Sequence, residues 1–293
     1  MRAAIIFGLG SSEKDLKPFQ RGTGIDWQIG LPASSDAADA ILIFGGDGTI
    51  HRHVAELVRL RLPVLIVPCG SGNDFARALG IYNLRTAFSA WQQFISAGNN
   101  TKVLDLGVIT SAKQPASRHY FCTVGGVGLD ADVARRANQL PRWLRGHGGY
   151  VAALPGALFG FAPLPMKISD QESSAGRILR NQPTILTAFA NGPTYGGGMK
   201  IAPNARMDDG KLDVCLIHDI GKVKLLALFP TVYFGKHLAV AGVDYLTTRG
   251  LRIETETPLD VYADGEFVCK TPINVSVATA ALSVITPSLK EGF

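Results

Sequence analysis

The first hundred residues alternate between short apolar runs and stretches with helical spacing of hydrophobic positions. The apolar runs predict strands at 3–7, 40–44 and 64–67, and the helical patterns predict helices at 50–60, 73–79 and 84–97. Buried strands joined through helices are typical of a parallel, doubly wound sheet. This part of the chain therefore predicts an α/β domain.

From about residue 103 the pattern changes to many short strands separated by turn residues. We expect strands at 103–109, 119–124, 165–168, 184–190, 212–217, 251–256, 259–263 and 273–277, with helices at 131–139, 150–161 and 222–234. Short strands at such spacing favour an antiparallel β-sandwich. We therefore predict an α/β domain over residues 1–108 and a β-sandwich domain over residues 109–285.

Composition narrows the class of protein. The chain has 33 glycines in 293 residues without a triplet repeat, so we expect backbone that turns sharply or approaches a ligand. Its net charge of +5 suits nucleotides, phosphates or acidic membrane surfaces, and the absence of a clustered basic stripe argues against nucleic acid. The four cysteines have no CxxC spacing, and no apolar run is long enough for a signal peptide or a membrane span. We expect a soluble, cytoplasmic protein.

The sharpest motif, GGDGT, follows the expected strand at 40–44. It consists of Gly45, Gly46, Asp47, Gly48 and Thr49. Ligands bind at such strand ends in open α/β sheets, because glycines admit an anion to the backbone and a helix N-terminus offers free amides. Asp47 has the chemistry to hold Mg²⁺ or to accept a proton, and Thr49 can donate to a phosphate. The structural alternative is a tight turn with Asp47 as a helix cap.

A second glycine loop follows the next expected strand. Here Gly70, Ser71 and Gly72 precede Asn73 and an aspartate at a helix start. If the two strands are neighbours in a parallel sheet, their loops lie at the same edge and two phosphate-compatible loops converge. A simple helix cap formed by Asn73 is the alternative.

A third glycine cluster, at 125–128, fits a dinucleotide-binding fingerprint only loosely. The strand with a terminal acid that this fingerprint requires about 20 residues later is missing. An NAD(P)-dependent oxidoreductase is therefore the weakest reading of the chain. P-loop, zinc-helix and nucleophile-elbow motifs are also missing from the sequence.

Acidic residues follow a run of glycines at 196–198. Asp208, Asp209 and Asp213 have the oxygen ligands that a hard cation prefers. A solvated hairpin is an equally good reading, because Asp-Gly is a strong turn signal.

The last motif is Asp264, Gly265 and Glu266, directly after the expected strand at 259–263. A glycine between two acids lets both carboxylates reach one site, as a general base and its neighbour require. Taken alone, however, the Asp-Gly pair favours an ordinary hairpin turn.

In their order along the chain these motifs resemble the diacylglycerol kinase catalytic family, which includes bacterial lipid kinases, sphingosine kinases and ceramide kinase. The segments that carry the resemblance are GGDGT (45–49), PCGSGNDFAR (68–77), GGVGLDADV (125–133), NGPTYGGGMKIAPNARMDDGKLDV (191–214) and DGE (264–266). The resemblance covers residues from about 40 to the C-terminus.

The resemblance implies an NAD kinase- and phosphofructokinase-like nucleotide domain, a C-terminal β-sandwich and an active site in the cleft between them. Residues 286–293 would return to the first domain. The GGDGT residues and Ser71 would contact ATP, and we expect Gly70, Gly72 and Asn73 to share in that site. The resemblance makes Glu266 the proton acceptor beside Asp264. It also places a structural Mg²⁺ at Asp209 and the carbonyls of Arg206 and Lys211.

We therefore expect an ATP- and Mg²⁺-dependent kinase that phosphorylates a hydroxyl of a diacylglycerol- or sphingosine-like lipid. The expected catalytic residues are Glu266, Asp264 and Asp47, with Asp47 and Mg²⁺ offsetting phosphate charge. Apolar residues at 151–165 and 225–234 would line an acyl-chain pocket or, alternatively, form core helices. The expected partners are the lipid and an anionic surface at the inner face of the membrane. The sequence leaves open whether the chain forms a homodimer. The alternatives are a soluble-substrate kinase of the NAD kinase type and a non-catalytic nucleotide- or lipid-binding protein.

The chain departs from the family pattern at several positions. It has FGLGSS at 7–12 where the family has an Asn-Pro-rich loop, and the segment between the first strand and GGDGT is short. His51 and Arg52 stand where the family prefers Asn-Glu, and Ser71 replaces a threonine while keeping the hydroxyl. We expect nucleotide affinity or preference to differ accordingly.

Overall fold

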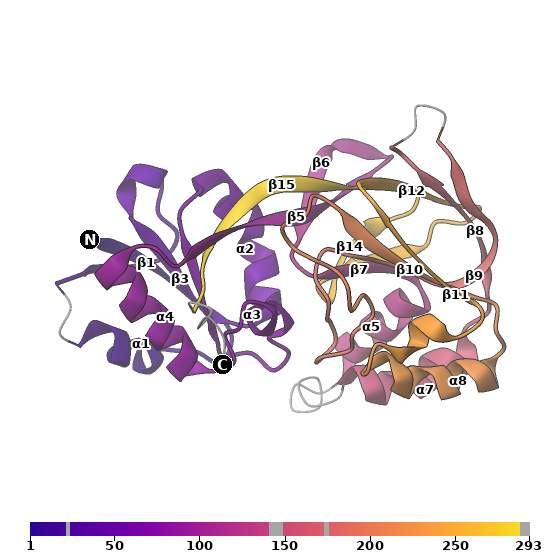
Figure 1. Ribbon diagram of the computed structural model, residues 1–293, viewed down its shortest axis with the longest axis horizontal. Coiled ribbons are helices and arrows are strands. Elements are labelled where there is room, and N and C mark those ends of the chain that lie inside the picture. The colour runs from indigo at the N-terminus through magenta and orange to yellow at the C-terminus, as the bar shows by residue number, and fades with distance from the viewer. Residues whose placement is uncertain (22–23, 141–148, 173–175, 288–293) are drawn as a thin grey trace. The chain divides into compact units, whose positions relative to one another are not determined.

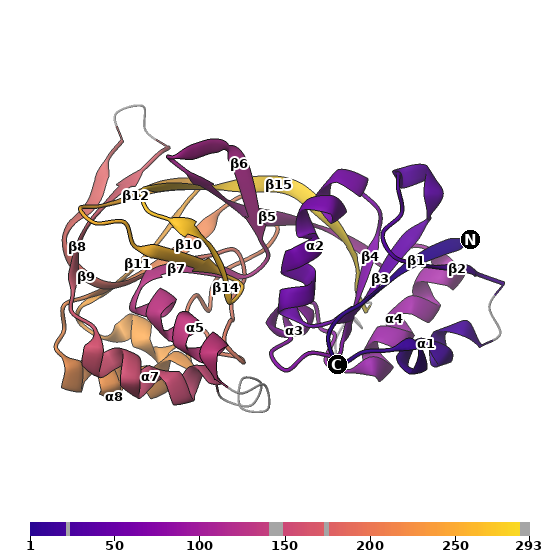
Figure 2. The same cartoon turned by 180° about the vertical axis from the view of Figure 1, so that it is seen from behind.

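The protein divides into two compact units, each described here by itself. The computed structural model describes residues 1–21, 24–140, 149–172 and 176–287 (Figures 1 and 2). Unit 1 comprises Met1–Leu104 and Ala280–Phe293, and unit 2 comprises Asp105–Thr279. The predicted boundary at 108/109 falls within β5 (Thr101–Ser111), and the one at 285/286 falls at the end of β15 (Ile273–Ile285). Each of these two strands contributes residues to both units.

Unit 1 is built on a parallel sheet with the strand order β4–β3–β1–β2. The strands are β1 (Arg2–Phe7), β2 (Asp26–Ile29), β3 (Ala40–Gly45) and β4 (Val64–Pro68). Every residue of β3 is buried, as its unbroken apolar run predicts. The end of β15 joins this sheet through the parallel pair Val284 and Val64.

Helices pack on the sheet of unit 1. They are α1 (Glu13–Gln20), α2 (Asp47–Leu60), α3 (Asp74–Ala78) and α4 (Leu84–Ala97), with a 3₁₀ turn at Ser35–Ala37. The bounds of α4 match the sequence prediction because both of its ends carry local signals. Asn83 accepts a hydrogen bond from the Thr86 amide at 3.0 Å, and Gly98 ends the helix in the left-handed conformation with φ 65°.

Unit 2 is mainly antiparallel, with the strand path β14–β13–β7–β9–β8–β12–β15; β10 pairs with β9 and β11, and β5 with β6. Its strands besides β5 and β15 are β6 (Gln114–Phe121), β7 (Val124–Gly128), β8 (Leu164–Asp170), β9 (Ile178–Ala190), β10 (Leu212–His218), β11 (Val243–Thr248), β12 (Gly250–Thr255), β13 (Asp260–Ala263) and β14 (Glu266–Lys270). The helices are α5 (Leu129–Gln139), α7 (Gly149–Gly160) and α8 (Lys222–Val232), with a 3₁₀ turn at Lys236–Ala239.

Among the described residues of unit 2, the two larger hydrophobic clusters lie on different sides of the strands' packing. One lies between strands and contains Phe121, Val127 and Phe189. The other lies where α5, α7 and α8 cover the strands, and it contains Leu129, Leu186 and Leu228. The predicted fold class, a parallel α/β unit followed by an antiparallel β-sandwich, is confirmed.

Several predicted elements differ from the structure. The pattern missed α1, β2, β11 and β14, whose residues are mostly partly or fully exposed and so give a weak hydrophobic signal. The strand expected at 119–124 is interrupted at Cys122 and Thr123, because both amides donate to the carboxylate of Asp264. Within the described residues, no helix is long and apolar enough to cross a membrane.

The third glycine cluster belongs to a strand, although the sequence predicted a strand only as far as residue 124. These glycines lie inside β7 and not in a loop after a strand. A Cβ atom on Gly125 would lie 2.2 Å from the Phe189 ring, and one on Gly126 would lie 2.2 Å from Oδ2 of Asp130. The glycines therefore make room for neighbouring side chains, which gives them a packing role.

Candidate functional site

The two glycine loops of unit 1 are in direct backbone contact. They follow β3 and β4, which are parallel neighbours with Gly45 paired to Pro68. A Cβ atom on Gly46 would lie 2.9 Å from the Gly70 Cα, and one on Gly70 would lie 2.5 Å from the Gly46 Cα. No side chain fits between the loops at this distance. The convergence expected for neighbouring parallel strands is therefore present.

Thr49 fills the space beneath the first loop. It lies in the first turn of α2 and is 8% exposed. Added Cβ atoms on Gly8 and Gly45 would lie 2.2 and 2.6 Å from its hydroxyl oxygen. These two glycines are thus needed for the threonine to pack. The N-cap of α2 is Gly46, which has no side chain to accept from the amides of the first turn, so this helix end suits an anion.

Asp47 joins the two loops through its carboxylate. Its Oδ2 accepts a hydrogen bond from the Asp74 amide at 3.0 Å, and its Oδ1 accepts one from the Phe75 amide at 3.1 Å. Asp47 therefore caps α3, the helix that follows the second loop, although it lies at the start of α2. The sequence analysis considered a cap on the helix of Asp47 itself and missed this one across the loops.

The second loop is closed by Asn73, which has a φ of 55°. Its Oδ1 accepts from the Gly70 amide at 3.1 Å, and its Nδ2 donates to the Gly70 carbonyl at 2.6 Å. Ser71 lies between these two anchored residues with an exposed side chain. The loop thus holds the serine hydroxyl on a short, hydrogen-bonded turn.

In unit 2, the acidic motif forms the tip of the β13–β14 hairpin. Ala263 pairs with Glu266, which leaves Asp264 and Gly265 as a two-residue turn with φ values of 49° and 83°. Positive φ at both positions is characteristic of a type I′ turn, for which Asp-Gly is a preferred pair. The hairpin reading of this motif is therefore correct, and it does not exclude a catalytic role.

The side chain of Asp264 points back into unit 2. Its Oδ2 accepts from the Cys122 amide at 2.7 Å, and its Oδ1 accepts from the Thr123 amide and hydroxyl at 2.8 and 2.7 Å. The Asp264 amide also donates to the Val124 carbonyl at 2.9 Å. Charge-assisted hydrogen bonds are stronger than neutral ones, so this carboxylate fixes the hairpin to the segment between β6 and β7.

Glu266 differs from Asp264 in its surroundings. Its side chain is exposed, and no described residue forms a hydrogen bond or an ion pair with its carboxylate. The turn before it is held from a second side, because Asn138 of α5 donates to the Gly265 carbonyl at 2.8 Å. A rigid turn thus presents an accessible carboxylate.

A buried network behind this hairpin escaped the sequence analysis. Asn191 is fully buried, and its Nδ2 donates to the carbonyls of Asp105 and Cys122 at 2.9 and 3.0 Å. The Asp105 carboxylate accepts from the Gly210 amide at 2.7 Å. These bonds link the anchor of Asp264 to the acidic segment near Asp209. The segment at 191–214 was singled out in the sequence for its glycines, its acids and its family resemblance, but not for the buried contacts of Asn191.

The residues predicted as cation ligands differ in their hydrogen-bond partners and in their burial. Asp209 accepts from the Lys211 amide at 3.1 Å, and Asp208 pairs with Arg206 at 3.3 Å. Asp213 is buried and accepts from the Tyr245 hydroxyl at 2.7 Å, and burial raises the pKa of its carboxyl group. In the described part of the chain no group of three or more His, Cys, Asp or Glu side chains could hold a metal. One carboxylate with backbone carbonyls is the donor set that stays available at Asp209.

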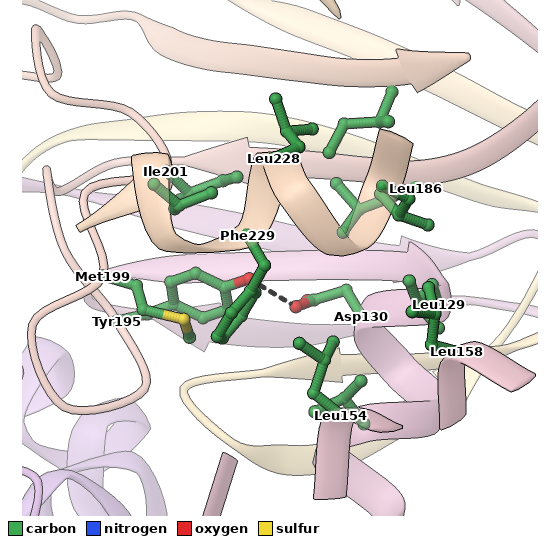
Figure 3. A pocket seen from close by; sticks show the side chains of 14 residues that line it. Leu129, Asp130, Leu154, Leu158, Leu186, Tyr195, Met199, Ile201, Leu228 and Phe229 are labelled. Atoms are coloured by element: carbon green, nitrogen blue, oxygen red, sulfur yellow. Dashed lines mark hydrogen bonds between the residues drawn. The ribbon is translucent and has the colours of Figure 1, made fainter. Parts of the chain in front are cut away.

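An apolar pocket lies among the helices of unit 2. Figure 3 shows it between α5, α7, α8 and the strands. Its lining residues are Leu129, Asp130, Val133, Leu154, Leu158, Leu186, Tyr195, Met199, Ile201, Ile217, Leu225, Leu228, Phe229 and Val232. One polar pair interrupts this surface, because the Tyr195 hydroxyl donates to Oδ1 of Asp130 at 2.7 Å. Both apolar stretches singled out in the sequence contribute to the lining and also form core helices.

Comparison with known proteins agrees with this geometry. The diacylglycerol kinase catalytic domain matches residues 28–109, and the YegS C-terminal NAD kinase beta sandwich-like domain matches residues 123–286. A diacylglycerol kinase of Mycobacterium tuberculosis is 34% identical over 259 residues, which cover 87% of this chain and 79% of that protein.

Solved structures support the same fold. A diacylglycerol kinase structure from Bacillus anthracis has a TM-score of 0.68 at 18% identity and covers 98% of this chain and 97% of that one. An NAD kinase from Archaeoglobus fulgidus in complex with ATP has a TM-score of 0.53 at 14% identity, covering 98% of this chain and 94% of that one. The matched domains and the mycobacterial relative show that the chain belongs to the diacylglycerol kinase family of lipid kinases.

Proposed function

We propose that this protein is an ATP- and Mg²⁺-dependent kinase that transfers a phosphoryl group to a hydroxyl of a diacylglycerol- or sphingosine-like lipid. The observation that carries the proposal is the β13–β14 hairpin. Its turn is fixed by Asp264 and Asn138, while the carboxylate of Glu266 stays accessible. Family membership supports the reaction type.

The nucleotide side of the proposed site consists of the two glycine loops of unit 1. The exposed hydroxyl of Ser71 and the amides at the start of α2 are suited to phosphate oxygens. Asp47 fixes the two loops to each other, so that they present these groups together. Mg²⁺ bound with ATP supplies charge neutralisation at the phosphates. The NAD kinase that shares the fold was solved with ATP, which supports this choice of nucleotide.

A second Mg²⁺ role is proposed at Asp209. The carboxylate of Asp209 and the carbonyls of Arg206 and Lys211 are hard oxygen donors, which is the chemistry that Mg²⁺ prefers. The segment is tied to the buried network through Gly210. A cation here would stabilise that segment and would not take part in the chemistry.

Glu266 is the proposed proton acceptor. As the lipid hydroxyl oxygen attacks the γ-phosphoryl group, its proton passes to the Glu266 carboxylate and ADP leaves. Asp264 is a positioning residue, because its oxygen atoms are engaged with Cys122 and Thr123. The reaction requires that the loops of unit 1 and Glu266 of unit 2 act on the same pair of substrates.

The apolar pocket of unit 2 is the proposed site for the acyl chain. Its lining is apolar except for the carboxylate of Asp130 and the hydroxyl group of Tyr195. A hydrocarbon chain gains free energy by leaving water for such a surface. The hydrogen-bonded Asp130–Tyr195 pair offers a polar contact to a hydroxyl or amine of the lipid at one place in the pocket.

A kinase assay with a lipid panel tests the proposal. Labelled ATP is supplied with diacylglycerol, sphingosine and ceramide, and with NAD as the soluble substrate, for the wild type and Glu266→Gln. Glu256→Gln is the matched control, because Glu256 is an exposed glutamate of the same unit. We expect lipid phosphorylation that Glu266→Gln abolishes and Glu256→Gln retains. Phosphorylation of NAD alone, or ATP binding without turnover on any substrate, would contradict the proposal.

A further inference from the structure

Helices α7 and α8 present apolar side chains on their outer as well as their inner sides. They lie side by side at one end of unit 2 (Figures 1 and 2), and Lys222 Nζ donates to the Phe159 carbonyl at 2.7 Å. Phe159 of α7, Val223 and Leu226 of α8, and Phe234, two residues after α8, are 67%, 85%, 48% and 73% exposed. We call these four residues the α7–α8 patch. Large apolar side chains that are exposed on neighbouring helices indicate an interaction surface.

The charged residues within the two segments that carry the patch have one sign. Residues 149–166, which include α7, contain no charged residue. Residues 220–243, which include α8, contain Lys222, Lys224 and Lys236 and no acid. The acids that border this stretch are Asp219 and Asp244, and Asp244 pairs with His218 at 2.6 Å. Exposed apolar side chains among lysines are complementary to a surface with an apolar interior and anionic head groups.

The helices that carry the patch also line the apolar pocket. The inner sides of the same two helices line it through Leu154 and Leu158 of α7 and Leu225 and Leu228 of α8. A lipid that reaches the outer side of these helices is therefore one helix diameter from the proposed acyl site.

We propose that the α7–α8 patch docks the protein onto an anionic lipid bilayer, with Phe159, Val223, Leu226 and Phe234 entering the interface. The choice of a lipid substrate rests on the proposed function, whereas the docking itself does not require turnover. A second copy of the chain is a poorer occupant. In a two-fold dimer the same surface meets itself, so the lysines of one copy would approach those of the other.

Vesicle co-sedimentation without nucleotide tests the docking. The protein is mixed with vesicles of phosphatidylcholine, either alone or with phosphatidylglycerol. The patch variant is Val223→Ser with Phe234→Ser, and neither residue lines the pocket. The control is Ile29→Ser with Ile178→Ser, two apolar residues that are 63% and 55% exposed elsewhere. We expect the patch variant to lose about tenfold or more in partitioning to the anionic vesicles, and the control to match the wild type.

Charge gives a second readout. Lys236→Gln should weaken binding to anionic vesicles about fivefold, and higher salt should weaken wild-type binding. Equal binding of wild type and patch variant, or equal binding to both vesicle types, would overturn the proposal. So would a wild-type dimer that the patch variant dissociates while vesicle binding is unchanged, as measured by analytical ultracentrifugation.

Failure of the docking and failure of the proposed function are distinguishable. Turnover of a short-chain, detergent-dispersed diacylglycerol needs no bilayer, so the patch variant should retain it. Vesicle binding that depends on the patch, combined with no kinase activity on any lipid, would leave the docking intact and reject the kinase. The reverse result would reject only the docking.

Discussion

Asp264 and Thr123 are joined by two hydrogen bonds to one carboxylate oxygen, from the amide at 2.8 Å and the hydroxyl at 2.7 Å. The bonds connect residues that are far apart in sequence. They also end β6, because the Cys122 and Thr123 amides face Asp264 and no neighbouring strand. The position of the Glu266 carboxylate thus depends on an anchor two residues before it.

Asp264→Asn should disturb this anchor, since an amide nitrogen would replace one acceptor oxygen and face a backbone donor. We expect the free energy of unfolding to fall by about 1–3 kcal/mol, measured by urea denaturation. The kcat should fall by more than the lipid KM rises, because the turn no longer holds Glu266. Thr123→Val removes only the hydroxyl bond and should cost about 1 kcal/mol. An Asp264→Asn protein with unchanged stability would argue against the anchor.

Glu266→Gln should separate activity from stability. The side chain is exposed, so the free energy of unfolding should change by no more than about 0.5 kcal/mol. The kcat should fall by about 10²–10⁴-fold if the carboxylate accepts the hydroxyl proton. Chemical denaturation and steady-state kinetics on the same preparation measure both quantities. A large loss of stability would point to a structural role instead.

Gly70→Ala should separate the two glycine loops. The added methyl would lie 2.5 Å from the Gly46 Cα, and the backbone atoms there cannot move aside as a flexible side chain can. We expect a loss of about 1–3 kcal/mol in stability and a weaker affinity for ATP, measured by denaturation and calorimetry. Gly24→Ala is the control, because no atom lies within 4 Å of the corresponding Cβ position. Unchanged nucleotide affinity in Gly70→Ala would contradict the role of the loop contact.

His237 should make stability depend on pH. It is fully buried, its Nε2 lies 3.0 Å from the Ile201 carbonyl, and burial lowers the pKa of its imidazole below 6.5. The unfolded chain therefore binds a proton that the folded chain resists, so stability is lost as the pH falls below 6.5 towards the lowered value. In His237→Gln the drop in unfolding free energy between pH 7.5 and about pH 5.5 should be smaller. A His237→Gln protein that shows the full wild-type drop would contradict this role of the buried imidazole.

Mg²⁺ should raise the thermal stability of the wild type in the absence of nucleotide. A ligand at about 100 times its Kd adds about 2.7 kcal/mol to folding. We expect a rise in Tm on adding MgCl₂ that Asp209→Asn removes. Asp219→Asn, at another exposed aspartate of unit 2, should keep it. An identical Mg²⁺ response in all three proteins would place the cation elsewhere.

The sequence predicted best where a signal is local. The buried run of β3, the capped ends of α4 and the Asp-Gly turn each lie within a few residues. It predicted the meeting of Gly46 and Gly70 because adjacent parallel strands end at one edge.

Contacts across long sequence distances left no such signal. Asp47 caps α3, which begins 27 residues later in the sequence. Asn191, directly after β9, donates to the carbonyls of Cys122 and Asp105. The packing role of the glycines of β7 left no local signal for the same reason, since Phe189 and Asp130 limit the side-chain size there from outside the motif.

The contact between Gly46 and Gly70 has a thermodynamic consequence. Glycine usually increases the conformational freedom of a loop. Here no residue larger than glycine fits at either position, because the two loops are close-packed against each other. Hydrogen bonds of Asp47 and Asn73 hold the same arrangement. The two glycine loops are therefore preorganised, and little conformational entropy is lost when a ligand binds to them. Affinity at these loops should depend on how well the ligand matches a fixed shape, so the loops would select among anions by geometry and not by adapting to each one.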